Sequence, residues 1–512
     1  MTMSTNPEVK EDVGAPPRSA WYNTPALQIP ILILLFTVAA AYESVHLSAL
    51  TSVDVGVHLR TGYWILQNHA IPRQGLFSQY PGSTWIASSW AYAALLAVAH
   101  KLMGLRALPV LLMVMEVGIA IVTFLLARGW RGNFWLAVLL SAASQCAITD
   151  LQPAPLTCSI VFYGIELILL FRSHRTRSTK PLFWLPCLFL LWANLHIQFL
   201  NGLCVLALFL LAETVEHFIH RSGHLWREDY TPIYSPGLFG AILGLSVFAT
   251  VLTPYSVHLI PEALSDAYSK IAFQYHAEMH PMNFRRPQDF MLLLLLMTAF
   301  FALGRQRSLS LFKLGLITIG TLIALRITRD GWFAVLPAIA VIADAVDGEE
   351  SSSQLPEGER YRIRSVALAV GVPVLAVLVI AGIRIPATGN VLMDRAATRL
   401  PVKACDFIRD NHLPGPLFNS EDWGGFLTWY LPEYPVAMDR RLGLYGEEAS
   451  EEYFETTDGR NLQAAPTFTG ARTILLPKSA GLARALSTFP GLTAHYRVLY
   501  NDDIAMVLER QE

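Results

Sequence analysis

The chain has 512 residues, of which 53% are hydrophobic and only 15% are charged, and its net charge is −2. Soluble globular domains carry about a quarter charged residues, so this composition excludes an ordinary soluble protein. The small net charge excludes the basic field of a nucleic-acid-binding protein, and five scattered cysteines exclude a disulfide framework or a zinc site.

The apolar residues form blocks, which is the pattern of membrane helices that each need about 20 residues to cross the bilayer. The first block begins near Ala26, too late and too long for a cleaved signal peptide, so we expect a retained first helix. The predicted spans are 27–49, 107–127, 133–149, 155–171, 182–195, 199–219, 235–253, 289–304, 310–327, 330–346 and 363–383.

The apolar stretch 85–103 has two interpretations, a re-entrant or interfacial helix and a further span. The positive-inside rule favours the first, because it gathers the basic loop residues on one side of the membrane. Eleven spans then place the N-terminal tail 1–26 in the cytoplasm and residues 385–512 in the periplasm of a bacterial inner membrane. The cytoplasmic loops would carry Arg128, Arg131, Arg172, Arg175, Arg177, Lys180, Arg221, Arg227, Arg305, Arg307, Arg360, Arg362 and Arg364.

Three large segments lie on the outer face in this topology. They are the first loop 50–106 and the loop 254–288, both within a transmembrane domain 27–384, and the C-terminal domain 385–512. The sequence has no P-loop, no dinucleotide-binding glycine motif, no HExxH and no GxSxG, which argues against a nucleotide-driven pump or a soluble-type hydrolase.

Asp54 and His58 open the first outer loop, and their spacing of four residues puts both on one face of a helix. A carboxylate beside an imidazole can act as a general base or hold a divalent cation. The alternative is that Asp54 only caps an interfacial helix and His58 lies among the lipid headgroups. The cofactor is therefore unknown at this stage, with a divalent metal as one option.

Polar residues also gather at the outer ends of later spans. Asp150 and Gln152 follow the third span, and Asn194 and His196 end the fifth. They are candidates for lining one outer cavity with Asp54; the alternatives are a solvated helix stop and an interfacial belt.

Arg326 and Arg329 join the ninth and tenth spans on the outer face, where the positive-inside rule disfavours basic residues. Guanidinium groups bind phosphate through paired hydrogen bonds, so an anionic ligand is one explanation. An ion pair with Asp330 is the other. In the loop 254–288 the alternation of His276, Glu278 and His280 is a weak metal-binding pattern.

After residue 385 the composition becomes globular. We predict helices at 401–411, 423–431, 445–457 and 480–488, strands at 415–420, 436–439 and 472–477, and a hairpin over 495–509. These elements make a small α/β unit. Asp439 and Arg441 follow the strand 436–439, where α/β sites usually form, so they are candidates for substrate binding; the alternative is a structural Asp–Arg network.

With these residues in view, the chain resembles the GT-C superfamily of membrane glycosyltransferases, which includes bacterial protein O-mannosyltransferases and lipid A aminoarabinose transferases. More narrowly, it is similar to a family of bacterial membrane proteins over nearly its whole length. The residues that carry this resemblance are Asp54, His58, Leu59 and Gly62; Ile71-Pro72 and Phe77-Ser78; Trp85 or Trp90; Trp192 to His196; Pro254-Tyr255; Trp423 to Leu427; and Asp439 with Arg441.

The resemblance implies a polytopic helical bundle that transfers a sugar from a polyprenyl-phosphate donor to an unknown acceptor on the outer face of the membrane. It gives Asp54 the role of catalytic base or metal ligand, with His58 beside it, and by position Arg326 and Arg329 would receive the carrier phosphate. Two alternatives stay open: a non-catalytic relative that binds a lipid carrier, and a transporter or flippase. The second predicts polar residues through the whole bundle, whereas those found here cluster at outer helix ends.

Overall fold

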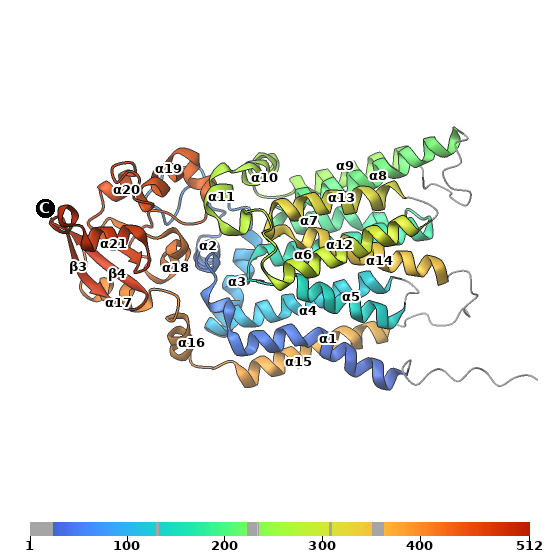
Figure 1. The fold of residues 1–512 in the computed structure, drawn as a ribbon, viewed down its shortest axis with the longest axis horizontal. Coiled ribbons are helices and arrows are strands. Elements are labelled where there is room, and N and C mark those ends of the chain that lie inside the picture. The colour runs from blue at the N-terminus through green and yellow to red at the C-terminus, as the bar shows by residue number, and fades with distance from the viewer. Residues whose placement is uncertain are drawn as a thin grey trace, which may run out of the picture.

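The computed structural model describes residues 24–129, 133–222, 233, 235–306, 310–350 and 363–511, and most of the predicted tail 1–26 lies outside them. A long helical bundle continues at one end into a small domain that contains a sheet (Figure 1). The helices up to the end of the bundle are α1 (Pro25–His46), α2 (Val55–Asn68), α3 (Trp90–Met103), α4 (Ala107–Arg128), α5 (Phe134–Ala147), α6 (Pro155–Thr176), α7 (Leu185–Leu195), α8 (Phe199–Arg221), α9 (Pro236–Val251), α10 (Leu259–Tyr268), α11 (Lys270–Tyr275), α12 (Pro287–Arg305), α13 (Leu311–Arg326), α14 (Trp332–Glu350) and α15 (Ile363–Arg384). Short 3₁₀ helices are η2 (Ser48–Thr51), η3 (Gly104–Arg106), η4 (Lys180–Trp184), η5 (Ser256–His258), η6 (Ala277–Met279) and η7 (Thr328–Asp330).

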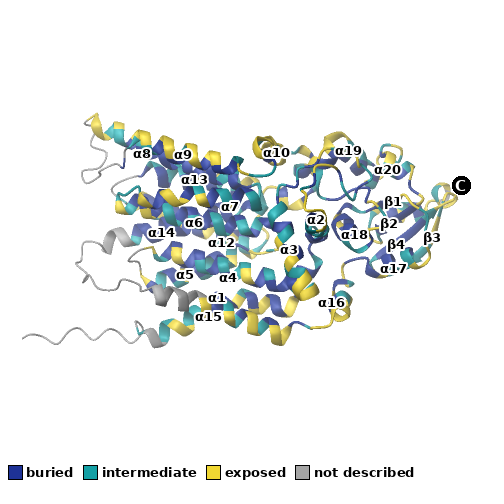
Figure 2. Ribbon diagram, turned by 180° about the vertical axis from the view of Figure 1, so that it is seen from behind, coloured by how far each residue is buried: buried dark blue, intermediate teal, exposed yellow. Residues whose placement is uncertain are grey.

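Local sequence explains where many of these helices start. Proline is the first helical residue of α6, α9 and α12, where its fixed φ suits the helix and its missing N–H costs nothing. The side chain of Asn133 accepts hydrogen bonds from two backbone N–H groups at the start of α5. Buried apolar side chains fill the interior of the bundle, and exposed residues lie mainly on its outer surface (Figure 2).

The prediction of a helical membrane bundle with a small C-terminal α/β unit is confirmed. Each of the eleven predicted spans is a helix whose ends lie close to the predicted ends. Among the described residues, however, only five helices are long and apolar enough to cross a membrane alone, or up to seven if each of two bent helix pairs counts as one span. The number of spans therefore stays a prediction.

The stretch 85–103 contains α3, which continues through η3 into α4 as a single run of 39 residues. Gly104, with φ 59° and ψ −148°, ends α3 and interrupts the helical backbone before η3. The run is therefore not one straight helix. The α3 end lies beside α2 near the C-terminal domain (Figure 1), which fits the interfacial interpretation.

The C-terminal domain contains a four-stranded sheet in the order β1-β2-β4-β3. β1 and β2 are parallel, and β2–β4 and β4–β3 are antiparallel. The strands are β1 (Leu417–Asn419), β2 (Thr473–Pro477), β3 (Tyr496–Asn501) and β4 (Ala505–Arg510). The helices are α16 (Gly389–Ala396), α17 (Val402–Asp410), α18 (Glu421–Tyr430), α19 (Leu442–Thr457), α20 (Pro466–Thr469), α21 (Gly481–Thr488) and α22 (Pro490–Thr493).

The predicted strand 436–439 is wrong. This segment makes one isolated bridge, from Val436 to Ser78 of the first loop, and does not join the sheet. The side chain of Asn419 takes the place of a strand partner, since it accepts from Ala437 N and donates to Met438 O, both at 2.8 Å. Arg440 and Arg441 therefore follow an irregular segment and not the carboxyl end of a sheet strand.

Candidate functional site

Asp54 immediately precedes α2 at the end of the bundle that faces the C-terminal domain. Upstream, the carboxylate of Glu43 accepts the backbone N–H of Ala49 at 3.0 Å, which fixes the turn between α1 and η2. Ser52 donates to the Gln152 side chain at 2.8 Å, so one of the predicted site residues holds the loop that leads to Asp54. The segment that leads to Asp54 is thus tied to α1 and to the loop between α5 and α6.

The carboxylate of Asp54 is left without a partner. It occupies the N-cap position of α2 but accepts no cap hydrogen bond, and among the described residues it makes no other hydrogen bond or ion pair. Asp54 therefore holds the N-cap position without the side-chain hydrogen bond by which such a residue stabilises a helix. A partly buried carboxylate with free lone pairs is able to accept a proton from a bound molecule.

The surroundings of Asp54 shift its affinity for protons. Burial raises the pKa of Asp54 from its ordinary 3.8 to about 6, the positive charge of Arg440 acts in the opposite direction, and the negative charges of Glu278, Glu421 and Asp439 add to the rise. At pH 7 the group is still mostly ionised. A carboxylate with a pKa near the working pH is well suited to act as a general base.

Two histidines lie in the same region. His58 follows Asp54 by one turn and contacts Tyr92 edge-on, with ring centroids 5.4 Å apart. His196 follows the end of α7, and its Nδ1 lies 2.7 Å from the Ser159 hydroxyl, which also accepts from Trp192 Nε1 at 2.7 Å. These contacts fix the imidazole ring of His196.

Both histidines are held neutral. Burial, followed by the charge of Arg441, lowers the pKa of His58 to about 4. Burial, followed by the charges of Arg329 and His58, lowers the pKa of His196 to about 3. The hydrogen bond from Gln198 Nε2 to Asp330 Oδ1, at 3.1 Å, connects the end of α7 to η7, and the charges of Arg329 and His58 both act on His196.

Arg329 supplies a positive charge from η7. Its Nε lies 3.4 Å from Asp330 Oδ1, which also accepts from Gln198 Nε2 at 3.1 Å. Its two terminal nitrogens make no hydrogen bond within the described part of the chain, and its side chain is 27% exposed. Thr328 N donates to the carbonyl of His280 at 3.1 Å, which ties η7 to the loop after α11. The free nitrogens present the paired donors that a phosphate group accepts.

A second arginine, Arg440, lies among acidic residues. Its Nη2 is 2.9 Å from Asp422, its Nη1 is 3.2 Å from Glu278, and its Nε is 3.5 Å from Glu421. Glu421 also lies 2.8 Å from His276 Nε2. The sequence patterns identified this group only in part. They gave His276 and Glu278 as a weak metal-binding pattern, and they predicted the adjacent Arg441, rather than Arg440, as a substrate-binding residue.

That neighbouring residue, Arg441, is bound within the protein. Its guanidinium forms a buried ion pair with Asp439, with Nη2 2.7 Å from Oδ2 and Nε 3.0 Å from both carboxylate oxygens. It also donates to the carbonyl of Leu76 and lies 4.6 Å from the Trp85 ring centroid. Asp439 is fully buried. This arrangement matches the structural network that we considered as the alternative.

No protein-family model matches the sequence, and no curated protein matches it significantly. Solved structures do match. The oligosaccharyltransferase AglB from Archaeoglobus fulgidus, in complex with an inhibitory peptide and a dolichol-phosphate, has a TM-score of 0.53 at 12% identity over 93% of this chain and 73% of AglB. The apo form of the A. fulgidus enzyme has a TM-score of 0.55 at 12% identity over the same shares of the two chains. ArnT from Cupriavidus metallidurans bound to undecaprenyl phosphate is a looser match, with a TM-score of 0.44 at 14% identity over 96% of this chain and 98% of ArnT.

The chain shares the fold of the A. fulgidus oligosaccharyltransferase, in agreement with the fold that the sequence resemblance implied. At 12% identity the likeness to AglB concerns the fold alone. Within this fold, the first loop, the loop before α12 and the C-terminal domain meet at one end of the bundle (Figure 1). We call the place where Asp54, His58, His196, Arg329 and Arg440 approach one another the junction site.

Asp150 and Arg326 are two of the six predicted site residues that lie outside this group; the others are Gln152, Asn194, Asp439 and Arg441. Asp150 is exposed and forms an ion pair with Arg286 at 3.1 Å. Arg326 is also exposed, and its guanidinium lies 5.2 Å from the ring centroid of Phe273. Of the two arginines predicted to receive a phosphate, only Arg329 lies where its charge acts on a junction-site histidine.

The side-chain amide of Asn194 is hydrogen-bonded within the protein at both its oxygen and its nitrogen. Its Oδ1 accepts from Trp90 Nε1 at 3.1 Å, and its Nδ2 donates to the carbonyl of Leu190 at 2.8 Å. It therefore links the end of α7 to the start of α3, close to His196.

Two glycines of α18 allow the C-terminal domain to pack closely against the helical bundle. A Cβ on Gly425 would lie 2.2 Å from the carbonyl oxygen of Val53, and one on Gly424 would lie 2.2 Å from that of Met438. On the facing helix, a Cβ on Gly56 would lie 2.0 Å from the carbonyl oxygen of Gly425. The start of α18 is thus wedged between the residues before Asp54 and those before Arg440, and only glycine allows this approach.

Replacing Gly425 by alanine should displace the Asp54 backbone and lower activity strongly. Overpacking of this kind costs about 1–3 kcal/mol in stability, and a displacement of about 1 Å can cost about 10²-fold in rate. The measurements are turnover and thermal unfolding of the purified variant. Gly481→Ala is the matched control, because a Cβ there meets nothing within 4 Å. Equal activity in the two variants would contradict the claim that close packing at Gly425 positions the Asp54 backbone.

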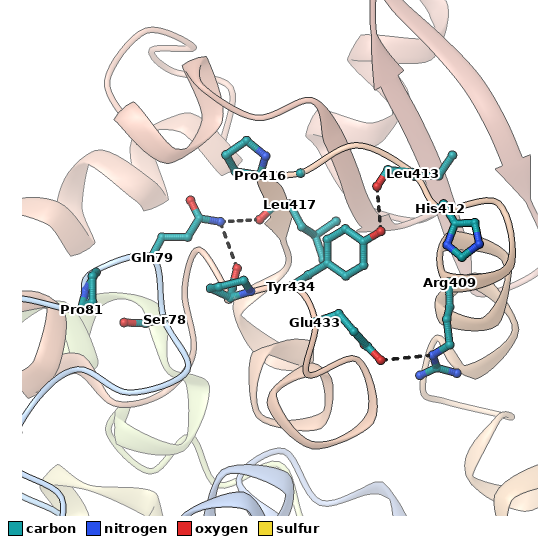
Figure 3. A pocket seen from close by; sticks show the side chains of 12 residues that line it. Ser78, Gln79, Pro81, Arg409, His412, Leu413, Pro416, Leu417, Glu433 and Tyr434 are labelled. Carbon is teal, nitrogen blue, oxygen red and sulfur yellow. Dashed lines mark hydrogen bonds and ion pairs between the residues drawn. The ribbon is translucent and has the colours of Figure 1, made fainter.

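A separate pocket of about 720 Å³ lies between the first loop and the C-terminal domain (Figure 3). Gln79 donates across it to the carbonyl of Leu417 at 2.7 Å, and Arg409 Nε lies 3.8 Å from Glu433 on its other side. The pocket lies beside Leu417 at the start of β1, whereas α18 and its acids follow the end of that strand. It is therefore distinct from the junction site.

Proposed function

We propose that the protein is a membrane glycosyltransferase that moves a sugar from a polyprenyl-phosphate carrier to an acceptor hydroxyl at the outer face of a bacterial inner membrane. One observation carries the proposal. The negative charge of Glu278 acts both on the unpaired carboxylate of Asp54 and on Arg329, whose terminal nitrogens are free within the described residues.

The proposed reaction needs a base and an anion-binding group. Asp54 takes the proton of the acceptor hydroxyl as its oxygen bonds to the anomeric carbon of the sugar. The bond from that carbon to the phosphate oxygen breaks, and the electron pair leaves with the polyprenyl phosphate. Arg329 stabilises the negative charge that develops on this oxygen. His58 and His196, both neutral, orient Asp54 or contact the sugar.

Several features support a lipid-linked donor. The bundle is apolar enough for a membrane, and the junction site lies at one end of it, where a carrier phosphate at the bilayer surface would be within reach (Figure 1). The AglB structure with the same fold was solved with a dolichol-phosphate. The periplasmic side, the sugar and the acceptor are part of the proposal.

The direct test is turnover by the purified full-length protein in nanodiscs. We expect release of polyprenyl phosphate from one of a panel of synthetic polyprenyl-phosphate sugars, and release about 10²–10⁴-fold slower from Asp54→Asn protein. Failure of every donor, with acceptors supplied as a membrane extract, would remove the proposed activity. A non-catalytic carrier-binding protein would instead bind donors without turnover in either form.

The pH profile should reveal which group is the base. Because the pKa of Asp54 is about 6, transfer should rise about tenfold per pH unit below pH 6 and level off above it. His58 and His196, with pKa values of about 4 and about 3, stay neutral across this window. A His196→Asn variant should therefore keep the midpoint near 6. A midpoint that moves in this variant would assign the titration to the imidazole.

A further inference from the structure

Acidic residues from three distant segments meet at the junction site, in the manner of a cation site. Asp54 precedes α2, Glu278 lies in η6, and Glu421 and Asp422 form the first turn of α18. The charges of Glu278 and Glu421 both act on Asp54. Carboxylate oxygens from separate elements are the ligands that hard divalent cations take.

The cation among these acids is a side chain. The guanidinium of Arg440 directs Nη1 to Glu278, Nη2 to Asp422 and Nε to Glu421, at 3.2, 2.9 and 3.5 Å respectively, and its charge also acts on Asp54. The side chain is only 21% exposed. A guanidinium stays protonated at any physiological pH, so the positive charge is permanent.

The same residues do not fit a metal ion. Among the residues that the structure describes, no three His, Cys, Asp or Glu side chains are arranged to hold one. The Glu421 oxygen closest to Arg440 is also 2.8 Å from His276 Nε2. A metal would have to displace both the guanidinium and this imidazole contact, while inner-sphere carboxylate ligands must approach a cation to about 2.0–2.6 Å.

We propose that Arg440 is the built-in cation of the junction site, replacing a divalent metal, and that transfer by this protein needs no metal ion. Only the second claim, that transfer needs no metal ion, rests on the proposed function. Arg440 offsets the negative charge of the acids around Asp54, and its direct partners are Glu278, Glu421 and Asp422. It therefore acts through its neighbours rather than by touching substrate.

The test compares Mn²⁺ binding to purified full-length protein with and without Arg440, by titration followed by electron paramagnetic resonance. We expect wild-type protein to bind no stoichiometric Mn²⁺. Arg440→Met protein, with uncompensated acids, should bind one Mn²⁺ about tenfold or more tightly than wild type. Arg409→Met is the matched control, because Arg409 pairs with Asp406 and Glu433 away from the site and its loss should create no such binding.

A second readout separates this role from a merely structural one. If the protein transfers sugar, wild-type turnover should be unchanged by EDTA, and Mn²⁺ should partly restore the turnover of Arg440→Met. Stoichiometric Mn²⁺ on wild-type protein that disappears in Glu278→Gln would overturn the proposal, even if Arg440→Met fails to fold. So would a folded Arg440→Met protein that binds no more Mn²⁺ than wild type. Because the titration needs no turnover, its outcome is independent of the proposed activity.

Discussion

Replacing Asp54 by asparagine should lower sugar transfer by about 10²–10⁴-fold, the usual contribution of a general base. Asparagine has nearly the same shape, and no hydrogen bond of the carboxylate is lost. The measurement is the turnover number with a polyprenyl-phosphate sugar at saturating donor. Donor affinity should change little, because the carboxylate acts on the acceptor. Equal turnover in variant and wild type would remove Asp54 from the mechanism.

Thermal unfolding provides the control for this variant. Burial raises the pKa of Asp54 from 3.8 to about 6, so the folded protein holds its proton more tightly than the unfolded chain does. Stability from this group is present below pH 3.8 and is lost as the pH rises through about 6. Relative to wild type, Asp54→Asn protein should therefore gain stability between these two pH values and keep the gain above them. A variant that unfolds more readily at pH 8 would contradict this assignment.

Replacing Arg329 by methionine should weaken the use of the donor. A hydrogen bond to a charged group contributes about 1.5–3 kcal/mol, which corresponds to about 10- to 100-fold in kcat/KM. Most of the loss should appear in the KM of the donor, with a further fall in kcat from the leaving phosphate. Arg329→Lys should be intermediate, since it keeps the charge and loses the paired donors.

Arg326→Met is the matched control for this change. Arg326 lies three residues earlier, is exposed and lies over the ring of Phe273. We expect its replacement to leave donor kinetics within about twofold of wild type, as surface changes usually do. A loss as large as that of Arg329→Met would mean that the phosphate is bound by both arginines. Thermal unfolding of Arg329→Met would reveal any destabilisation from leaving Asp330 without its partner.

Much of the architecture could be predicted because the formation of membrane helices depends on local sequence. Blocks of about 20 apolar residues give membrane helices whatever their neighbours. The hairpin of β3 and β4 was likewise visible in its alternating pattern and turn. The strand expected at 436–439 failed because a side chain, that of Asn419, supplies the hydrogen bonds that a neighbouring strand would have made.

The candidate site was predictable only in its separate parts. Asp54, His58, His196 and Arg329 could each be selected as polar groups at membrane-helix ends. Their approach to one another depends on the packing of helices that are far apart in the sequence. In the same way, Arg440 rather than Arg441 faces the acids because of the course of the turn after Met438, and no local pattern distinguishes two adjacent arginines.

The contact between Gly56 and Gly425 has a mechanical consequence. Backbone atoms, rather than flexible side chains, determine the separation of α2 and α18. A hinge motion that swung the C-terminal domain off the bundle would part these backbones and carry Arg440 away from Asp54. The backbone contact of α2 with α18 and the charge arrangement around Asp54 would therefore be lost together in any such motion.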